Sequence, residues 1–450
     1  MLRAVLAATL GGALRLFFRR IEVVGRDRVP TTGPTLFAIN HPNALVDPIL
    51  LLCYAPRPVS FLGKAPLFRI PVIGWLARAL ETIPVHRRQD GTTDPRQNRE
   101  TFARARSLLE NGGTIAIAPE GASHSDPKHR PIKTGAARIA LGAGTSDPVA
   151  IVPVGLFYTE KAVFRSSALV LFGEPLRVVS TAVDADGEPP AQRVTEVTSQ
   201  LEAALAGLVP QADDHEAHRL AARAERLVTA ALTDPKPRAL DDVRVVRQRL
   251  LDGYRHLRDR EPILLGRLTR RVDRLDRAFR RAGLSPADIG SRPPALASVP
   301  RAIWWLLVRV VVFLPLALPG AVIHYPAYRL IGMLARRVAK THDDVLATAK
   351  IIGAFVFYPV TWLLVGWSVG SAFGWPVGLA AGIFAPVTGY AAVKLVERFD
   401  RFVSATKAFG FYLAEPEHYE RLATECDALR RDLLEIAGRL DASGQAAPTR

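Results

Sequence analysis

The sequence predicts an α/β domain over residues 21–180, followed by a helical region and a C-terminal membrane-helix hairpin. In residues 21–180, short apolar runs alternate with helical stretches, which is the pattern of an α/β domain. Residues 351–393 contain no charged residue, whereas residues 241–282 are rich in arginine. The whole chain of 450 residues is 49% hydrophobic with a net charge of +16, so this composition averages over unlike parts.

The positive net charge limits the kind of partner that this chain would bind, and its two cysteines limit the kind of site that it could form. A basic chain suits a polyanion, which is either nucleic acid or an anionic membrane surface. The uncharged tract favours the membrane, so we expect a phospholipid membrane as partner and no nucleic acid. The two cysteines, Cys53 and Cys426, lie far apart inside apolar helical patterns, which argues against a disulfide framework or a thiolate metal site. A reducing, cytoplasm-facing body fits this pattern.

Residues 1–20 predict an interfacial, membrane-anchoring helix. The alternative is a signal peptide or a full span, but the apolar run is short and Arg19 and Arg20 follow where a cleavage site would lie. Apolar residues recur at helical spacing on one side of this segment: Leu2, Val5, Leu6, Leu10, Leu14 and Phe17.

The α/β pattern gives strands and helices in turn. Short apolar runs bounded by Gly, Pro or Asn predict strands at 35–39, 59–62, 114–118, 150–157 and 168–172. The stretches between them predict helices at 47–54, 97–110 and 133–142.

Residues 181–300 predict a helical, basic extension that closes in a proline-rich linker over 285–300. Leu268, Val272, Leu275 and Phe279 form one apolar stripe between arginines. The stripe predicts a packed seam between solvated helices. A basic face in contact with lipid is the alternative.

Residues 301–395 predict a membrane region. The uncharged tract 351–393 is about twice the roughly 20 residues that cross a bilayer, and 370–376 supply a turn, so two antiparallel spans are expected. Lys350 and Lys394 bracket this hairpin, which puts both outer ends, and the α/β domain with them, on the cytoplasmic face. Segment 302–323 contains Arg309, Pro315 and Pro319, which favours a kinked, re-entrant or interfacial segment over a plain span.

Residues 396–450 predict an amphipathic C-terminal helix with a polar tail. One heptad face of this helix carries Leu422, Cys426, Leu429, Leu433, Ile436 and Leu440, as a packed or paired helix would.

A histidine and an aspartate follow the predicted strand 35–39. Asp47 could accept a hydrogen bond from one ring nitrogen of His41 and fix the tautomer, so that the other nitrogen can take a proton from a hydroxyl. A strand-to-helix turn is where α/β folds expose reactive groups. A capping or core histidine is the alternative on these residues alone.

Further motifs follow in order along the chain and favour a catalytic role for His41 over a capping or core role. They resemble the four motifs of the glycerolipid acyltransferase family, the 1-acylglycerol-3-phosphate and glycerol-3-phosphate acyltransferases, over roughly residues 20–180. The resemblance implies an acyltransferase domain with a mixed sheet and flanking helices. The blocks are Asn40-His41-Pro42-Asn43-Ala44-Leu45-Val46-Asp47; Gly63-Lys64-Ala65-Pro66-Leu67-Phe68 with Ile83-Pro84-Val85-His86-Arg87-Arg88; Pro119-Glu120-Gly121-Ala122-Ser123 with Lys133-Thr134-Gly135; and Val152-Pro153-Val154-Gly155.

The resemblance implies roles for residues of these blocks. His41 is similar to the family's general base and Asp47 to its partner. The common motif has four residues between His and Asp, whereas five lie here, as in some members that include fungal-type glycerol-3-phosphate acyltransferases. An irregular turn after His41 would accommodate the extra residue. The acceptor phosphate is expected at Gly63, Lys64 and Arg87, with Arg88 beside them; the acceptor at Glu120 and Gly121, with Ser123 in the same block; and the acyl donor at Pro153.

Other chemistries have weaker support. Cys53 is expected to pack rather than to act as a nucleophile. Ser123 lacks the G-x-S-x-G surroundings of a nucleophilic serine. His86, His124 and His129 do not have zinc-ligand spacing, so we expect no metal. The sequence has no Walker or Rossmann glycine motif, so we expect no cofactor other than the acyl thioester that serves as co-substrate.

The expected function is therefore a membrane-bound O-acyltransferase of phospholipid biosynthesis. It would move a fatty acyl chain from acyl-CoA or acyl carrier protein to the hydroxyl of 1-acylglycerol 3-phosphate by direct attack. Glycerol 3-phosphate or another lysophospholipid is the alternative acceptor. A catalytically inactive membrane scaffold or transport component is the alternative of another class.

Overall fold

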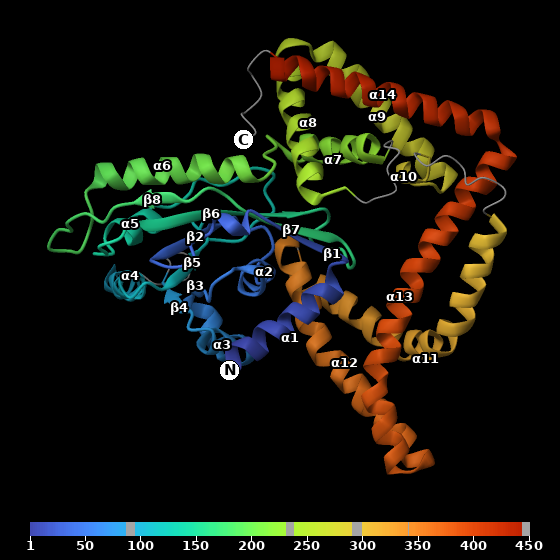
Figure 1. Ribbon diagram of the computed structural model, residues 1–450, viewed down its shortest axis with the longest axis horizontal. Helices are drawn as coiled ribbons and strands as arrows, with labels where there is room; N and C mark the ends of the chain where they lie inside the picture. Colours follow the sequence, from blue (N-terminus) through green and yellow to red (C-terminus); the bar gives the residue numbers. More distant parts are fainter. Residues whose placement is uncertain (87–94, 231–237, 290–298, 341, 443–450) are drawn as a thin grey trace. The chain divides into compact units, whose positions relative to one another are not determined.

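The computed structural model describes residues 1–86, 95–230, 238–289, 299–340 and 342–442 (Figure 1). The chain divides into two units. We call residues 1–214, 239–244 and 341–348 the sheet unit, and residues 215–238, 245–340 and 349–450 the helical unit.

A mixed sheet is the centre of the sheet unit, as predicted. In the described part of the chain it has eight strands in the order β1-β7-β6-β2-β5-β3-β4, with β8 paired to β6. Strands β2, β3, β4, β5 and β6 run parallel, while β7 and β8 are antiparallel to β6. The strands are β1 (Arg20–Val24), β2 (Thr35–Ile39), β3 (Ser60–Lys64), β4 (Ile83–Val85), β5 (Thr114–Ile117), β6 (Val149–Tyr158), β7 (Ser167–Phe172) and β8 (Leu176–Val178).

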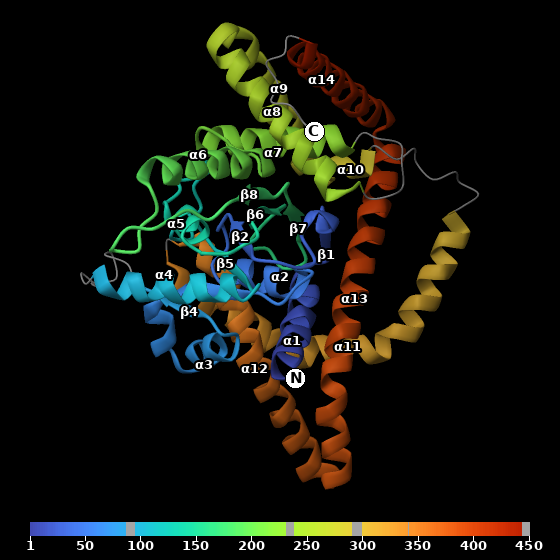
Figure 2. The same ribbon diagram turned by 60° about the vertical axis from the view of Figure 1, so that its left-hand side comes forward.

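Helices cover both faces of this sheet. Figures 1 and 2 show α5 and α6 on one face and α1 and α2 on the other. The helices are α1 (Leu2–Phe17), α2 (Val46–Tyr54), α3 (Pro71–Ala79), α4 (Pro95–Glu110), α5 (Gly135–Leu141) and α6 (Ala191–Leu208), with short 3-10 turns η1 (Arg26–Arg28) and η2 (Ala65–Arg69).

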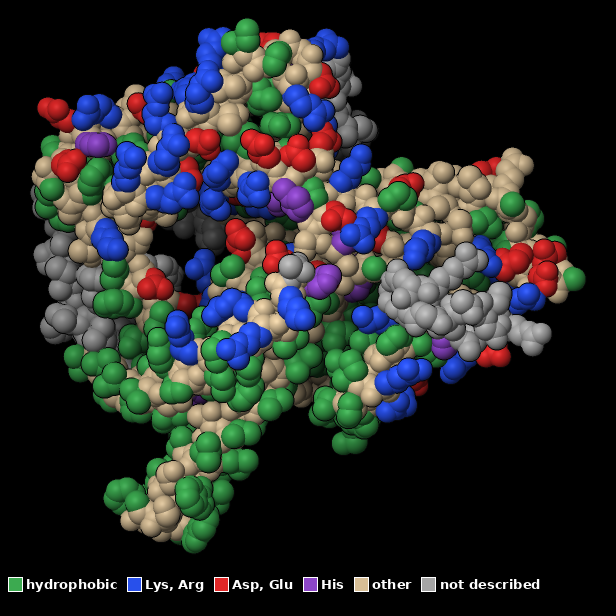
Figure 3. Space-filling view, turned by 180° about the vertical axis from the view of Figure 1, so that it is seen from behind, with side chains coloured by type: hydrophobic (Ala, Val, Ile, Leu, Met, Phe, Trp, Pro, Cys, Tyr) green, Lys and Arg blue, Asp and Glu red, His purple; other side chains and the backbone are tan. Residues whose placement is uncertain are grey.

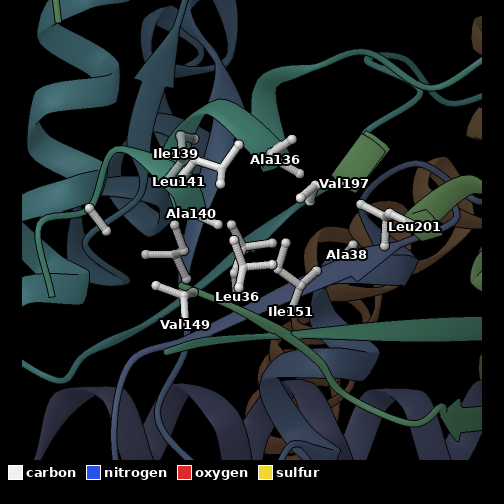
Figure 4. Close-up of a cluster of buried hydrophobic side chains, with 14 of the residues drawn as sticks. Leu36, Ala38, Ala136, Ile139, Ala140, Leu141, Val149, Ile151, Val197 and Leu201 are labelled. Carbon is white, nitrogen blue, oxygen red and sulfur yellow. The ribbon is translucent and has the colours of Figure 1, made fainter. Parts of the chain in front are cut away.

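The core on one face forms where β2 and β6 meet α5 and α6. Leu36 and Ile151 point from the strands toward Leu141 and Leu201 of the helices, and all four are buried (Figure 4). Alternate residues of β2 face opposite sides, so Phe37 packs instead against Phe172 on the other face. Near-continuous apolar strands are expected where helices cover both faces of a parallel sheet.

The predicted strands and helices of this unit are confirmed, but several short elements were missed. Strands β4 and β8 have three residues each, which is too short to show a period of two. Strand β1 carries Arg20 and Glu22, so its sequence is not apolar, and its pairing with β7 defines it. Helix α3 likewise gave no distinct signal.

Helix α1 is present where the sequence predicts an interfacial helix. Leu14 and Phe17 are buried, and the Cys53 thiol of α2 donates a hydrogen bond to the Ala7 carbonyl, so one side of α1 belongs to the core of the sheet unit. Leu2 and Val5 remain exposed. Membrane contact of this exposed end stays a prediction.

The helical unit contains a bundle with the seams that the sequence predicts. Leu268 and Phe279 of α9 are buried in one cluster with Leu422 and Leu429 of α14. The helices are α7 (His215–Ala230), α8 (Leu240–Arg260), α9 (Pro262–Ala282), α10 (Pro286–Ile289), α11 (Val299–Ala339), α12 (Asp343–Phe373), α13 (Trp375–Ala414) and α14 (Pro416–Ala442). The first residues of α8 and the first turn of α12 belong to the sheet unit.

Helices α12 and α13 form the predicted hairpin, with Gly374 at φ 95° in the turn. Among the described residues, two segments, Asp343–Phe373 and Trp375–Asp400, are long and apolar enough to cross a membrane. Most of the apolar side chains of both segments are exposed, as expected for helices that lie in a membrane. Figure 3 shows hydrophobic side chains over the α12–α13 hairpin. Helix α11 contains Pro315, Pro319 and Pro326 and bends along its length (Figures 1 and 2), as predicted for a kinked segment.

Glycines allow the two helices of the hairpin to approach backbone to backbone. Gly366 and Gly370 on α12 face Gly378 and Gly382 on α13, a pair of small-xxx-small patterns. A Cβ added at Gly378 would lie 2.5 Å from the Gly370 Cα, whereas one at Gly382 would find its nearest atom at 3.4 Å. Gly378 is therefore the position where a side chain forces the helices apart.

We expect Gly378→Ala to destabilise the hairpin by about 1 to 3 kcal/mol, the usual cost of overpacking, while Gly382→Ala, the matched control, has little effect. Thermal denaturation of the detergent-solubilised protein measures both. Equal melting temperatures for the two variants would contradict the close packing at Gly378.

Candidate active site

The predicted site residues follow strands that end at the same edge of the sheet. Strands β2, β3, β4 and β5 are parallel, so the turns that follow them emerge together at their carboxyl ends. His41 follows β2, Lys64 ends β3, and Glu120 lies just after β5. The His124 N–H donates to the His41 carbonyl over 3.2 Å, which joins the first and third sequence blocks directly.

The turn between β2 and α2, residues 40–45, carries His41, and we call it the histidine turn. Asn40 fixes its start, because its side chain donates to the Leu156 carbonyl (3.1 Å) and accepts from the Leu156 N–H (2.7 Å). His41 is partly exposed, with 21% of its side chain accessible, whereas Asp47 on the first turn of α2 is fully buried. The two side chains meet, with 2.9 Å between His41 Nδ1 and Asp47 Oδ2.

Asp47 is held by groups from distant parts of the chain. The Asn43 N–H donates to Asp47 Oδ2 over 2.7 Å, and the Tyr158 hydroxyl at the end of β6 donates to Oδ1 over 2.5 Å. Burial, and then the adjacent carboxylate, raise the pKa of Tyr158 well above its usual value, so its phenol remains a proton donor. A carboxylate held in this way accepts Nδ1–H of His41 and leaves Nε2 as the nitrogen that can accept a proton.

The longer spacing between His41 and Asp47 is accommodated in the histidine turn. Helix α2 begins only at Val46, and Ala44 has φ 40°, in the left-handed region that favours glycine. The irregular backbone takes up the fifth intervening residue, so the ring and the carboxylate still meet. This is the turn geometry that the sequence required.

Glu120 is bound within its own loop. Its carboxylate contacts His124 Nε2 and lies 3.2 Å from His129 Nδ1, and the Arg130 N–H donates to it over 3.3 Å. Burial opposes ionisation of Glu120, but the hydrogen bonds with His124 and His129 outweigh it and lower its pKa to about 2. Both carboxylate oxygens therefore have partners inside the protein.

The remaining predicted residues fall into four groups. Gly63 and Lys64 close β3 at the site edge, with Lys64 exposed. Pro153 is buried in β6, where this strand changes its antiparallel partner from β8 to β7. Gly121 lies at φ 79° next to Glu120, while Ser123 donates to Asp344 Oδ2 over 2.5 Å. Arg87 and Arg88 lie outside the described residues.

Sequence reasoning missed several polar residues of this site. Tyr158 and Lys161 come from the end of β6 and the turn after it, and Asp344 and Thr348 come from the first turns of α12. No local pattern could have singled them out. His124 and His129, whose spacing does not suit zinc, contact the Glu120 carboxylate. No group of three or more His, Cys, Asp or Glu in the described residues could hold a metal ion.

Two family models match separate parts of the chain. The acyltransferase model matches residues 20–156, and the model described as the glycerol-3-phosphate acyltransferase 2 C-terminal domain matches residues 223–440.

Curated relatives match over different lengths. Glycerol-3-phosphate O-acyltransferase 2 of Saccharomyces cerevisiae is 29% identical over 59% of this chain and 37% of its own length. Glycerol-3-phosphate O-acyltransferase 1 of the same yeast is 24% identical over 78% of this chain and 59% of its own length. A chloroplastic 1-acyl-sn-glycerol-3-phosphate acyltransferase of Arabidopsis thaliana is 29% identical over 36% of this chain and 43% of its own. The match therefore spans less than two thirds of each of these relatives.

The low pKa of Glu120 predicts a pH dependence of stability. Because the folded pKa of about 2 lies below the ordinary value of 4.5, ionised Glu120 stabilises the fold above about pH 4.5, and this contribution is lost as the pH falls toward 2. The shift corresponds to about 3 kcal/mol.

We expect Glu120→Gln to be less stable than the wild type near neutral pH and the difference to shrink in acid. Thermal unfolding between pH 7 and pH 3 measures it, with Glu202→Gln on the exposed side of α6 as control. A stability difference that is constant over this range would contradict the role of the ionised carboxylate.

Proposed function

Because the chain belongs to the glycerolipid acyltransferase family, we propose that it transfers a fatty acyl chain from an acyl thioester to a hydroxyl of a glycerophosphate acceptor. The observation that carries this proposal is the buried Asp47 beside a partly exposed His41, 2.9 Å apart. No cofactor is needed for such a transfer beyond the thioester itself, which is acyl-CoA or acyl-loaded carrier protein.

His41 acts as the general base in this proposal. Asp47 keeps the proton on Nδ1, so Nε2 takes the proton of the acceptor hydroxyl as its oxygen attacks the thioester carbonyl carbon. The carbon–sulfur bond of the tetrahedral intermediate then breaks, and the protonated ring returns its proton to the departing thiolate. The products are an ester and a free thiol, and His41 is neutral again.

Asp47 has two roles in this cycle. It orients the ring, and its negative charge stabilises the imidazolium that forms when the hydroxyl proton is taken up. The hydrogen bonds from Asn43 N–H and Tyr158 hold the carboxylate without supplying a competing proton, since the phenol keeps its own.

A cation at this edge of the sheet suits an anionic acceptor. Lys64 is exposed at the end of β3, and we assign the acceptor phosphate to it with Gly63, Arg87 and Arg88. Glu120, Gly121 and Ser123 shape the neighbouring loop. Since both oxygens of Glu120 have partners within the loop, its role is to position that loop. Pro153 remains our candidate for the side that receives the acyl donor.

The acceptor that the relatives favour is glycerol 3-phosphate. The match to the yeast glycerol-3-phosphate acyltransferases extends over as much as 78% of this chain, whereas the plant 1-acylglycerol-3-phosphate acyltransferase matches only 36%. The model that matches residues 223–440 also carries a glycerol-3-phosphate acyltransferase description. The second candidate, 1-acylglycerol 3-phosphate, is supported by the plant relative.

The α12–α13 hairpin suits attachment to the membrane that holds the lipid products. Its exposed apolar side chains fit a hydrocarbon environment, and Lys350 and Lys394 flank the uncharged part. We infer that both flanks, and with them the sheet unit, face the cytoplasm, where acyl thioesters are available.

Removing the base tests the mechanism. We expect His41→Ala to lower kcat/KM by about 10² to 10⁴, the usual contribution of a positioned general base, while the protein stays folded and membrane-inserted. His215→Ala, an exposed histidine at the start of α7, is the control. Activity of His41→Ala close to that of the wild type would remove this mechanism.

A panel of acceptors tests the substrate. With labelled acyl-CoA and acyl carrier protein as donors, we expect the highest kcat/KM with glycerol 3-phosphate and a lower value with 1-acylglycerol 3-phosphate. The reverse order would identify a lysophosphatidic acid acyltransferase. Wild-type protein in membranes that transfers acyl chains to no acceptor would favour an inactive scaffold.

A further inference from the structure

The first turns of α12 belong to the sheet unit and contact its site loops. Residues 341–348 group with the sheet unit, whereas the rest of this helix belongs to the helical unit. The Leu45 N–H donates to Thr348 Oγ1 over 3.1 Å, and the Ser123 hydroxyl donates to Asp344 Oδ2 over 2.5 Å. Asp344 and Thr348 are each only 7% exposed. Buried polar side chains are costly unless they are hydrogen-bonded, and these two are bonded to the site.

Lys161 lies in the turn after β6 and contacts the histidine turn. Its ammonium donates to the Pro42 carbonyl over 3.0 Å and to Ser125 Oγ over 2.6 Å. The Asn43 side chain returns a hydrogen bond to the Lys161 carbonyl over 3.1 Å. Lys161 therefore ties the histidine turn to the loop that follows β5.

Burial lowers the pKa of Lys161, and carboxylates on three elements oppose that shift. These are Asp47 on α2, Asp126 in the loop after β5, and Asp343 and Asp344 on the first turn of α12.

The histidine turn needs such external support. Ala44 is held at φ 40°, a conformation that a non-glycine residue adopts only when its surroundings enforce it. The backbone groups that define the turn have partners outside it: the Pro42 carbonyl on Lys161, the Asn43 N–H on Asp47, and the Leu45 N–H on Thr348. Two of these three partners come from Lys161 and α12.

We propose that Thr348 and Lys161 are positioning residues for the His41–Asp47 pair, so that the start of the membrane helix α12 is a working part of the active site. Thr348 fixes the Leu45 end of the histidine turn and Lys161 fixes the Pro42 end. The inference rests on the proposed function of His41 as base.

Thr348 is tested by removing its hydroxyl and then restoring it. Thr348→Val keeps the shape and loses the acceptor for Leu45 N–H, and we expect kcat to fall about fivefold to tenfold, as for one lost hydrogen bond, with the acceptor KM within about twofold. Thr348→Ser should recover most of kcat. The matched control is Thr361→Val on the same helix. Among the described residues, the Thr361 hydroxyl donates a hydrogen bond only to the Phe357 carbonyl, so this variant should behave as the wild type.

Lys161 is tested by removing its ammonium and then restoring a donor. Lys161→Met loses the hydrogen bond to the Pro42 carbonyl, and we expect kcat to fall about fivefold to tenfold, with the acceptor KM within about twofold. Lys161→Arg, which can donate again, should recover part of kcat. Lys128→Met, an exposed lysine in the loop after β5, is the control.

Amide hydrogen exchange tests the same contacts without an activity measurement. We expect faster amide exchange over residues 42–46 in Thr348→Val than in Thr361→Val, and a smaller change over the strands of the sheet unit. Wild-type kcat and exchange in Thr348→Val, or wild-type kcat in Lys161→Met, would overturn the proposal. If the wild type transfers no acyl group at all, the proposed function fails, and hydrogen exchange still decides whether Thr348 holds the turn.

Discussion

Asp47 presents a carboxylate with no solvent exposure, and its hydrogen bonds organise the region around it. One oxygen accepts from the Asn43 N–H and meets His41, and the other accepts from Tyr158. A buried carboxylate is tolerated only when its lone pairs are satisfied, so the histidine turn, the end of β6 and the first turn of α2 must come together. The same contacts leave one ring nitrogen of His41 available, which is the requirement for a general base.

The parallel sheet explains why separate sequence blocks form one site. Strands β2, β3 and β5 deliver the turns with His41, Lys64 and Glu120 to the same edge, because parallel strands all end on that side. Helices on both faces close the core beneath this edge, so the loops rest on a rigid base (Figure 4). In the proposed mechanism the His41–Asp47 pair needs such support, since small displacements of a reacting group are costly in rate.

Two kinds of close packing serve different parts of the molecule. In the hairpin, glycines let α12 and α13 approach at the backbone, while apolar side chains of both helices remain exposed. In the α9 and α14 region, larger apolar side chains fill a seam while charged residues remain outside, as in a water-soluble bundle. One helix, α12, begins among polar contacts of the sheet unit and continues as an apolar span, so polar and apolar environments meet along a single element.

Local pattern alone determined much of this protein. A contiguous periodic pattern or a local composition was enough to predict the strands at 35–39 and 168–172, the seam of α9 and the turn of the hairpin. The order of the motifs likewise identified His41 and Asp47. Only the tertiary structure decided how Asp47 is held, because Tyr158 lies 111 residues from it and Thr348 lies 303 residues from Leu45. Hydrogen bonds of that sequence separation leave no periodic trace, since they depend on where folded strands and helices end in space.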